Sequence, residues 1–75
     1  MNDSGTVAAL GEPALLQGFR LAGAVLYPAT GAEQVRAAWS GLPDTVSAVI
    51  LTPGAASILV DERNLPTAPL TAVMP

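Results

Sequence analysis

The chain has 75 residues, and a domain of this size buries only about 60% of the surface that its unfolded chain exposes, so we expect one domain over residues 1–75 with a thin stability margin. Hydrophobic residues make up 51% of the chain but aromatic residues only 4%, so the core must be built from Ala, Val, Leu and Ile. The net charge is −3, the basic residues are scattered arginines, and Lys, His and Cys do not occur. This composition excludes a cationic surface for nucleic acid, catalysis by imidazole or thiolate, and disulfides.

The longest apolar run, residues 21–27, is far shorter than the roughly 20 residues that span a bilayer. The first ten residues carry no Lys or Arg, so they lack the basic region of a secretory signal. We therefore predict a soluble protein without direct membrane insertion, peripheral to a membrane at most, and an intracellular compartment fits the absence of Cys.

The first predicted strand covers residues 6–10 (TVAAL), and a helix follows over residues 13–22. Pro13 suits the first turn of that helix, and Gly23 suits the position after its end. Four apolar residues recur at the spacing of a stripe that faces the core: Leu15, Leu16, Phe19 and Ala22.

Gly18 lies inside this predicted helix, where glycine costs about 1 kcal/mol relative to alanine. One interpretation is close packing of the helix on the sheet, and the other is a contact surface for a partner protein. Both use the missing Cβ. Arg20 is either a solvent-exposed residue whose stem covers apolar neighbours or a partner contact beside Gly18.

The second predicted strand covers residues 24–27, and Thr30 can cap the helix that follows it. Glu33, three residues after Thr30, can reach back to complete a capping box. Trp39 lies on the apolar face of this helix, so it is predicted to be part of the core, a lid over the core, or an interface anchor.

A third strand at residues 47–51 is almost entirely apolar, as expected of a central strand covered on both faces. A helix of one or two turns over residues 55–61 and a last strand at residues 69–74 complete the chain. Alternation of strands and helices with right-handed crossovers predicts an α/β fold, a small parallel sheet in the order 2-1-3-4 with helices on both faces, similar to a flavodoxin or receiver domain.

Ligands of such sheets bind beyond the carboxyl ends of the strands. The residues expected there are Gly11, Glu12, Pro28, Thr30, Thr52 and Gly54. The turn LGEPALL has one glycine followed by an acid, so it lacks the G-x-G-x-x-G pattern that binds a dinucleotide. Thr52 stands where a receiver domain needs an acid, and no metal-binding pattern occurs among the acidic residues. We therefore predict no catalytic residue, no metal and no cofactor.

Three segments together resemble the F subunit of the V-type and archaeal A-type rotary ATPases. Within GEPALLQGFRLAGAVLYPATGAEQVRAAW, the residues from Gly18 to Gly23 match the family signature G-F-R/K-L-A-G. SAVILTPGAASIL is similar to the third strand and following helix of the family, and LPTAPLTAVMP is similar to its closing strand. The resemblance covers about residues 7–75.

The resemblance implies a non-catalytic central-stalk subunit, peripheral to the membrane, that binds the coiled coil of the D stalk subunit. Through the D stalk subunit, it would help couple ATP hydrolysis or synthesis in the A and B subunits to rotation and proton or sodium transport. Gly18, Arg20 and Leu21 are then the candidate partner contacts. Family members continue with a C-terminal helix along the stalk, which is missing after Pro75 here, so weaker docking is expected. The alternative is a free-standing receiver-like or flavodoxin-like regulatory domain without catalytic activity.

Overall fold

The structure is a computed structural model that describes residues 5–18 and 23–75. Its centre is a four-stranded, all-parallel sheet in the spatial order β2-β1-β3-β4. The strands are β1 (Thr6–Gly11), β2 (Ala24–Pro28), β3 (Val46–Leu51) and β4 (Leu70–Val73). The predicted α/β class, parallel pairing and strand order are therefore confirmed.

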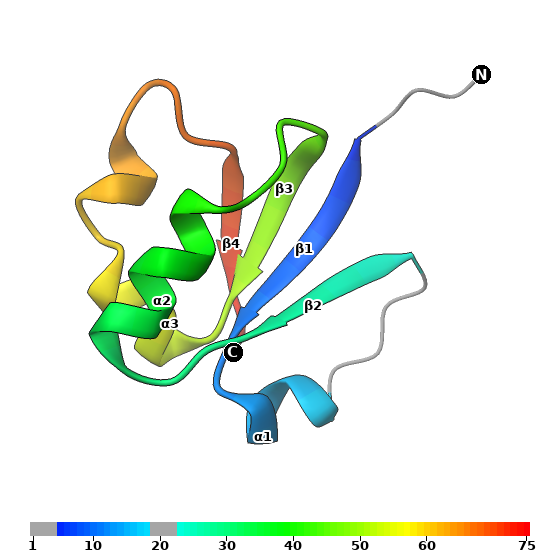
Figure 1. Cartoon of the computed structure of the whole chain (residues 1–75), viewed down its shortest axis with the longest axis vertical. Coiled ribbons are helices and arrows are strands. Elements are labelled where there is room, and N and C mark those ends of the chain that lie inside the picture. Colours follow the sequence, from blue (N-terminus) through cyan, green and yellow to red (C-terminus); the bar gives the residue numbers. More distant parts are fainter. Residues whose placement is uncertain (1–4, 19–22) are drawn as a thin grey trace.

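Three α-helices and one 3-10 helix connect the strands: α1 (Pro13–Gln17), α2 (Gly31–Ser40), α3 (Pro53–Ile58) and η1 (Glu62–Asn64). Figure 1 shows α2 and α3 together on one side of the sheet, whereas α1 lies beyond the carboxyl ends of the strands. Helix α1 makes its main contacts with β1 and β2. Among the described residues, coverage of the second sheet face is therefore smaller than coverage of the first.

The main core lies between the sheet and the pair α2 and α3. Ten buried residues form it, and all are small or aliphatic: Ala8, Leu10, Ala29, Val35, Val46, Val49, Leu51, Ala55, Ala56 and Leu59. Tyr27 and Trp39 pack against this cluster but are only partly buried. The part of the core that the structure describes is therefore built from Ala, Val and Leu, in line with the composition.

Helix α1 is shorter than predicted. It ends at Gln17, and Gly18 is its C-cap in an ordinary helical conformation, with φ −84° and ψ −7°. Leu16 is only 2% exposed, but Leu15 is 49% exposed, so the prediction that both belong to one core-facing stripe is wrong. Phe19 and Ala22 lie outside the described residues.

Helix α2 has Thr30 as its N-cap, as predicted, but the predicted capping box with Glu33 is wrong. The Thr30 side chain makes no capping hydrogen bond, and the Thr30 backbone N–H donates to Oε1 of Gln34 at 2.9 Å. Gly31 has φ +82° and therefore departs from helical geometry. The first regular helical turn therefore starts one residue later than predicted. As a result, the side chain that reaches back to the Thr30 backbone N–H is that of Gln34 and not that of Glu33.

Helix α3 begins two residues earlier than predicted because Thr52 caps it. The Thr52 hydroxyl oxygen accepts a hydrogen bond from the backbone N–H of Ala55 at 3.2 Å. Pro53 then occupies the first turn, where the missing N–H costs nothing. The expected short helix is confirmed, but it lies over Pro53–Ile58.

Candidate functional site

The carboxyl ends of β1 and β3 bring together residues that are far apart in the sequence. Glu12 follows β1 and Thr52 follows β3, and the Thr52 hydroxyl donates a hydrogen bond to Oε1 of Glu12. Thr52 is completely buried, whereas Glu12 is half-buried. One hydroxyl thus caps α3 and anchors the turn before α1.

Two glycines make room for this contact. A Cβ atom at Gly11 would overlap the side chain of Thr52, and a Cβ atom at Gly54 would lie 2.6 Å from Oε2 of Glu12. Pro28 is the sheet neighbour of Gly11, and the Thr30 backbone is bonded to Gln34. The edge where ligands of doubly wound sheets usually bind is therefore occupied by the side chains of this chain itself.

The electrostatics of this edge also oppose an anionic ligand. The hydrogen bond from the Thr52 hydroxyl, together with one from the Glu12 backbone N–H, lowers the pKa of the Glu12 carboxyl below its usual 4.5. Glu12 is therefore ionised at neutral pH and would repel a phosphate. The described residues contain no group of three or more acidic side chains placed to hold a metal ion.

The second face of the sheet is the largest unexplained surface. Ala8 and Leu10 belong to the core cluster, so the alternate residues of β1 and their sheet neighbours point to the other side. All eight are apolar, and we call them the open sheet face: Val7, Ala9, Ala24, Leu26, Ala48, Ile50, Leu70 and Ala72.

The described residues cover the open sheet face only in part. Ala9 is fully buried, but Leu26 is 46% exposed and Leu70 is 76% exposed. All-parallel sheets occur almost only with both faces covered, because both faces are apolar. The open sheet face is therefore the candidate interaction surface of this protein.

Of the three residues predicted as partner contacts, the structure describes only Gly18. Gly18 is exposed, and among the described residues a Cβ atom there would meet only the carbonyl oxygen of Leu15 at 4.0 Å, so the interpretation that Gly18 packs closely on the sheet is wrong. That interpretation assumed that Gly18 lies inside a helix, whereas Gly18 is the C-cap of α1. Arg20 and Leu21 lie outside the described residues. The signal that was missed is that the edge strands, AVLYP in β2 and LTAV in β4, carry apolar residues on the face opposite the core as well.

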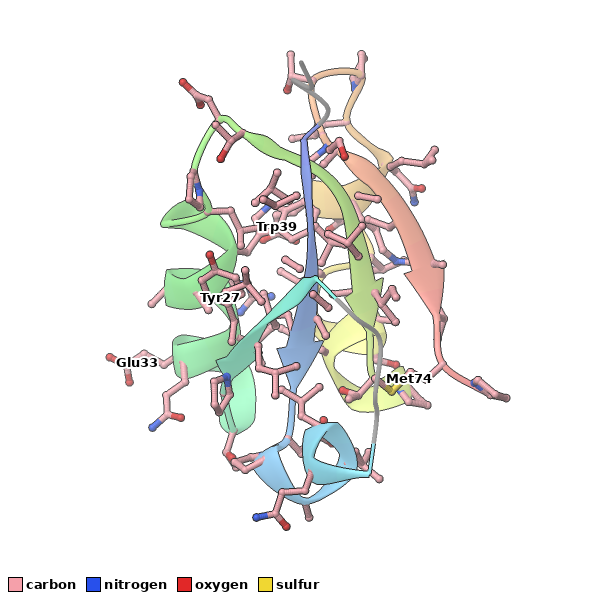
Figure 2. The ribbon with its side chains drawn as sticks, turned by 90° about the vertical axis from the view of Figure 1, so that its right-hand side faces the viewer. Tyr27, Glu33, Trp39 and Met74 are labelled. Carbon is pink, nitrogen blue, oxygen red and sulfur yellow. The ribbon has the colours of Figure 1, made fainter. Side chains whose placement is uncertain are left out.

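A cleft of about 290 Å³ lies at the opposite end of the sheet, where α2 ends and the segment before β4 runs past it. Its lining residues are Trp39, Leu42, Pro43, Asp44, Val46, Glu62, Leu65, Thr67, Ala68 and Pro69. Seven of these ten residues have apolar side chains and the other three are Thr67, Asp44 and Glu62, but most of the exposed surface of the cleft is polar. Figure 2 shows Trp39 beside the strands and Glu33 at the other end of α2.

Among the residues that the structure describes, no helix is both long and apolar enough to cross a membrane. Comparisons with protein-family models, with curated protein sequences and with solved structures gave no match. The geometry of the open sheet face, the carboxyl edge and the cleft therefore carries the functional argument.

Proposed function

We propose that this chain is a non-catalytic interaction subunit, of the kind that the F subunit represents in the central stalk of rotary V-type and A-type ATPases. The observation that carries the proposal is the open sheet face, an uncharged apolar surface that the described residues cover only in part. The strand order and the match of residues 18–23 to the F-subunit signature support it.

The carboxyl edge favours an interaction protein over an enzyme. The Glu12 carboxylate is held by Thr52, and its lowered pKa makes it a weak base at neutral pH. Glycines at this edge usually leave room for a phosphate, but here Gly11 leaves room for the side chain of Thr52 and Gly54 for that of Glu12. This edge therefore serves to hold the turn before α1 against the start of α3.

The partner that suits the open sheet face is an apolar helix surface, such as one helix of the D-subunit coiled coil. Helices are the elements that normally cover parallel sheets. Complete burial of an exposed Leu side chain contributes about 1.5–3 kcal/mol, so Leu70 and Leu26 alone offer useful binding energy. In this role the protein acts at the cytoplasmic side of the complex, peripheral to the membrane, and transmits rotation between ATP turnover and ion transport.

The test is co-elution of the purified chain with a D-subunit coiled coil. Leu70→Asp places a charge on the open sheet face, so it should weaken binding about tenfold or more, which corresponds to about 1.4 kcal/mol. Val60→Asp is the matched control, because Val60 is 45% exposed and lies after α3, away from that face. Both variants should keep the melting curve of the parent chain.

Two outcomes would count against the proposal. Equal binding by the Leu70→Asp and Val60→Asp variants would remove the open sheet face from the interface. No co-elution of the parent chain at micromolar concentration would instead favour the free-standing regulatory domain. Partner contacts by Gly18, Arg20 and Leu21 remain predictions. Arg20→Glu reverses the charge at residue 20, so its effect on binding in the same assay tests the contact predicted for Arg20.

A further inference from the structure

We propose that the cleft beside Trp39 binds one basic side chain, a Lys or Arg, presented by a partner protein. The inference joins three features of one place in the fold: a hollow, an indole ring in its wall, and two carboxylates from different elements. It is independent of the open sheet face, because the cleft lies at the amino ends of β3 and β4.

The size and the wall of the cleft suit a single long side chain. Its volume of about 290 Å³ is at the lower end of ligand pockets, which usually measure about 300–1,000 Å³. Leu42, Val46 and Leu65 supply apolar surface for an aliphatic stem. Lys and Arg bury such stems on apolar surface while they keep the charged group near a polar partner.

The charge of the cleft selects a cation. Nε of Arg36 lies 3.2 Å from Oε2 of Glu62, and the Arg36 guanidinium also donates to the Ile58 carbonyl oxygen at 3.3 Å. Arg36 is thereby held beside α3, outside the lining of the cleft. No salt bridge joins Asp44 to another described residue. Asp44 and Glu62 are the charged residues of the lining, and Arg36 pairs with Glu62, so the negative charge offered to a ligand is mainly that of Asp44.

The neighbouring arginine does not fill the cleft. Arg63 follows Glu62 in η1, but it is not among the lining residues, and its Nε atom is buried without a hydrogen-bond partner among the described residues. Trp39 is partly buried against the core and forms the aromatic wall. Tryptophan is the aromatic side chain that attracts a cation most strongly through its ring face.

The experiment uses two peptides that differ by one charge, acetyl-Leu-Lys-Leu-amide and its analogue with norleucine in place of lysine. Trp39 is the single tryptophan of the chain, so its fluorescence reports occupancy of the cleft directly. An ion pair and a cation–π contact at a partly exposed site together predict about fivefold tighter binding of the lysine peptide. Salt at about 1 M should remove most of this preference, because the Debye length falls to about 3 Å.

Asp44→Asn should reduce the preference for the lysine peptide to about twofold or less, whereas Glu33→Gln should leave it at fivefold. Glu33 is the matched control, since it is an exposed acid in the first turn of α2 and does not line the cleft. Equal binding of both peptides to the parent chain would overturn the proposal. So would a preference that survives Asp44→Asn, or the absence of any fluorescence change up to roughly 10 mM peptide.

Discussion

Gly11 is the position where backbone and surroundings together demand glycine. Its φ of +151° lies in a region that other residues rarely adopt, and the Thr52 side chain fills the space where a Cβ atom would lie. Gly18 differs in both respects: its φ of −84° is helical, and among the described residues a Cβ atom there would have no close neighbour. The fold therefore requires glycine at Gly11, before α1, whereas the described residues show no requirement for glycine at Gly18, after α1.

Gly11→Ala should lower the free energy of unfolding by about 1–3 kcal/mol, because it combines backbone strain with overpacking against Thr52. Gly18→Ala should be neutral or stabilise by about 0.4–1 kcal/mol, because alanine fits its conformation and loses less entropy on folding. Urea denaturation of both variants measures the two values. Similar losses at the two positions would show that the turn after β1 is less constrained than its geometry indicates.

The sequence showed which residue types occur at these positions, but it could not show which side chains contact one another. Glu12 and Thr52 are separated by 40 positions, and no local pattern connects an acid in one turn with a hydroxyl in another. Both were expected at the carboxyl edge, because strand order places them there, but their hydrogen bond depends on side-chain geometry. For Gly18, a helical period that continued through residue 22 hid the end of α1 at Gln17.

At the scale of elements, the Glu12–Thr52 hydrogen bond couples the turn before α1 to the start of α3, and its strength depends on pH. The folded pKa of Glu12 lies below the usual 4.5, so the bond stabilises the fold above pH 4.5. As the pH falls through the folded pKa, Glu12 takes up a proton and this contribution is lost. Stability should therefore decline with acid through this pair.

Glu12→Gln removes the charge and tests this coupling. The parent chain should be more stable than the variant at pH 7, and the gap should shrink as the pH is lowered to about 3. Thr52→Val removes the donor, so a second substitution at Glu12 in that background should change the pH dependence little. Urea denaturation at several pH values gives all four curves. A gap that stays constant between pH 7 and 3 would contradict the coupling.

Elements were easier to predict than their ends. Alternation of apolar runs with helical segments indicated four strands, and right-handed crossovers then allowed the order 2-1-3-4. The ends of the helices depend on single hydrogen bonds, such as the one from Ala55 to Thr52, which began α3 earlier than its composition indicated. Gly31, with its positive φ, shifted the first turn of α2 in the same way.

At the scale of the whole molecule, most of the core that the structure describes lies on one side of the sheet. Ten buried residues lie between the sheet and the pair α2 and α3, and the largest of them are leucines. The other face of the sheet leaves Leu26 and Leu70 exposed. Periodicity indicated which strand residues are apolar, but it could not show that the described helices gather on one face, because that depends on tertiary contacts.

We expect the purified chain to unfold with a melting temperature at or below the usual mesophilic range of about 45–65 °C. Domains have about 0.05–0.15 kcal/mol of stability per residue, and a core of Ala, Val and Leu on one face lies at the lower end of that range. A partner that covers the open sheet face at 100 times its dissociation constant adds about 2.7 kcal/mol. For a chain of this size, that gain corresponds to a rise of about 10–20 °C in calorimetry. At the same partner concentration, the tenfold weaker binding expected of the Leu70→Asp variant should remove about half of this rise or more, whereas the Val60→Asp variant should retain it. A melting temperature above about 80 °C without a partner would mean that the open sheet face needs no cover.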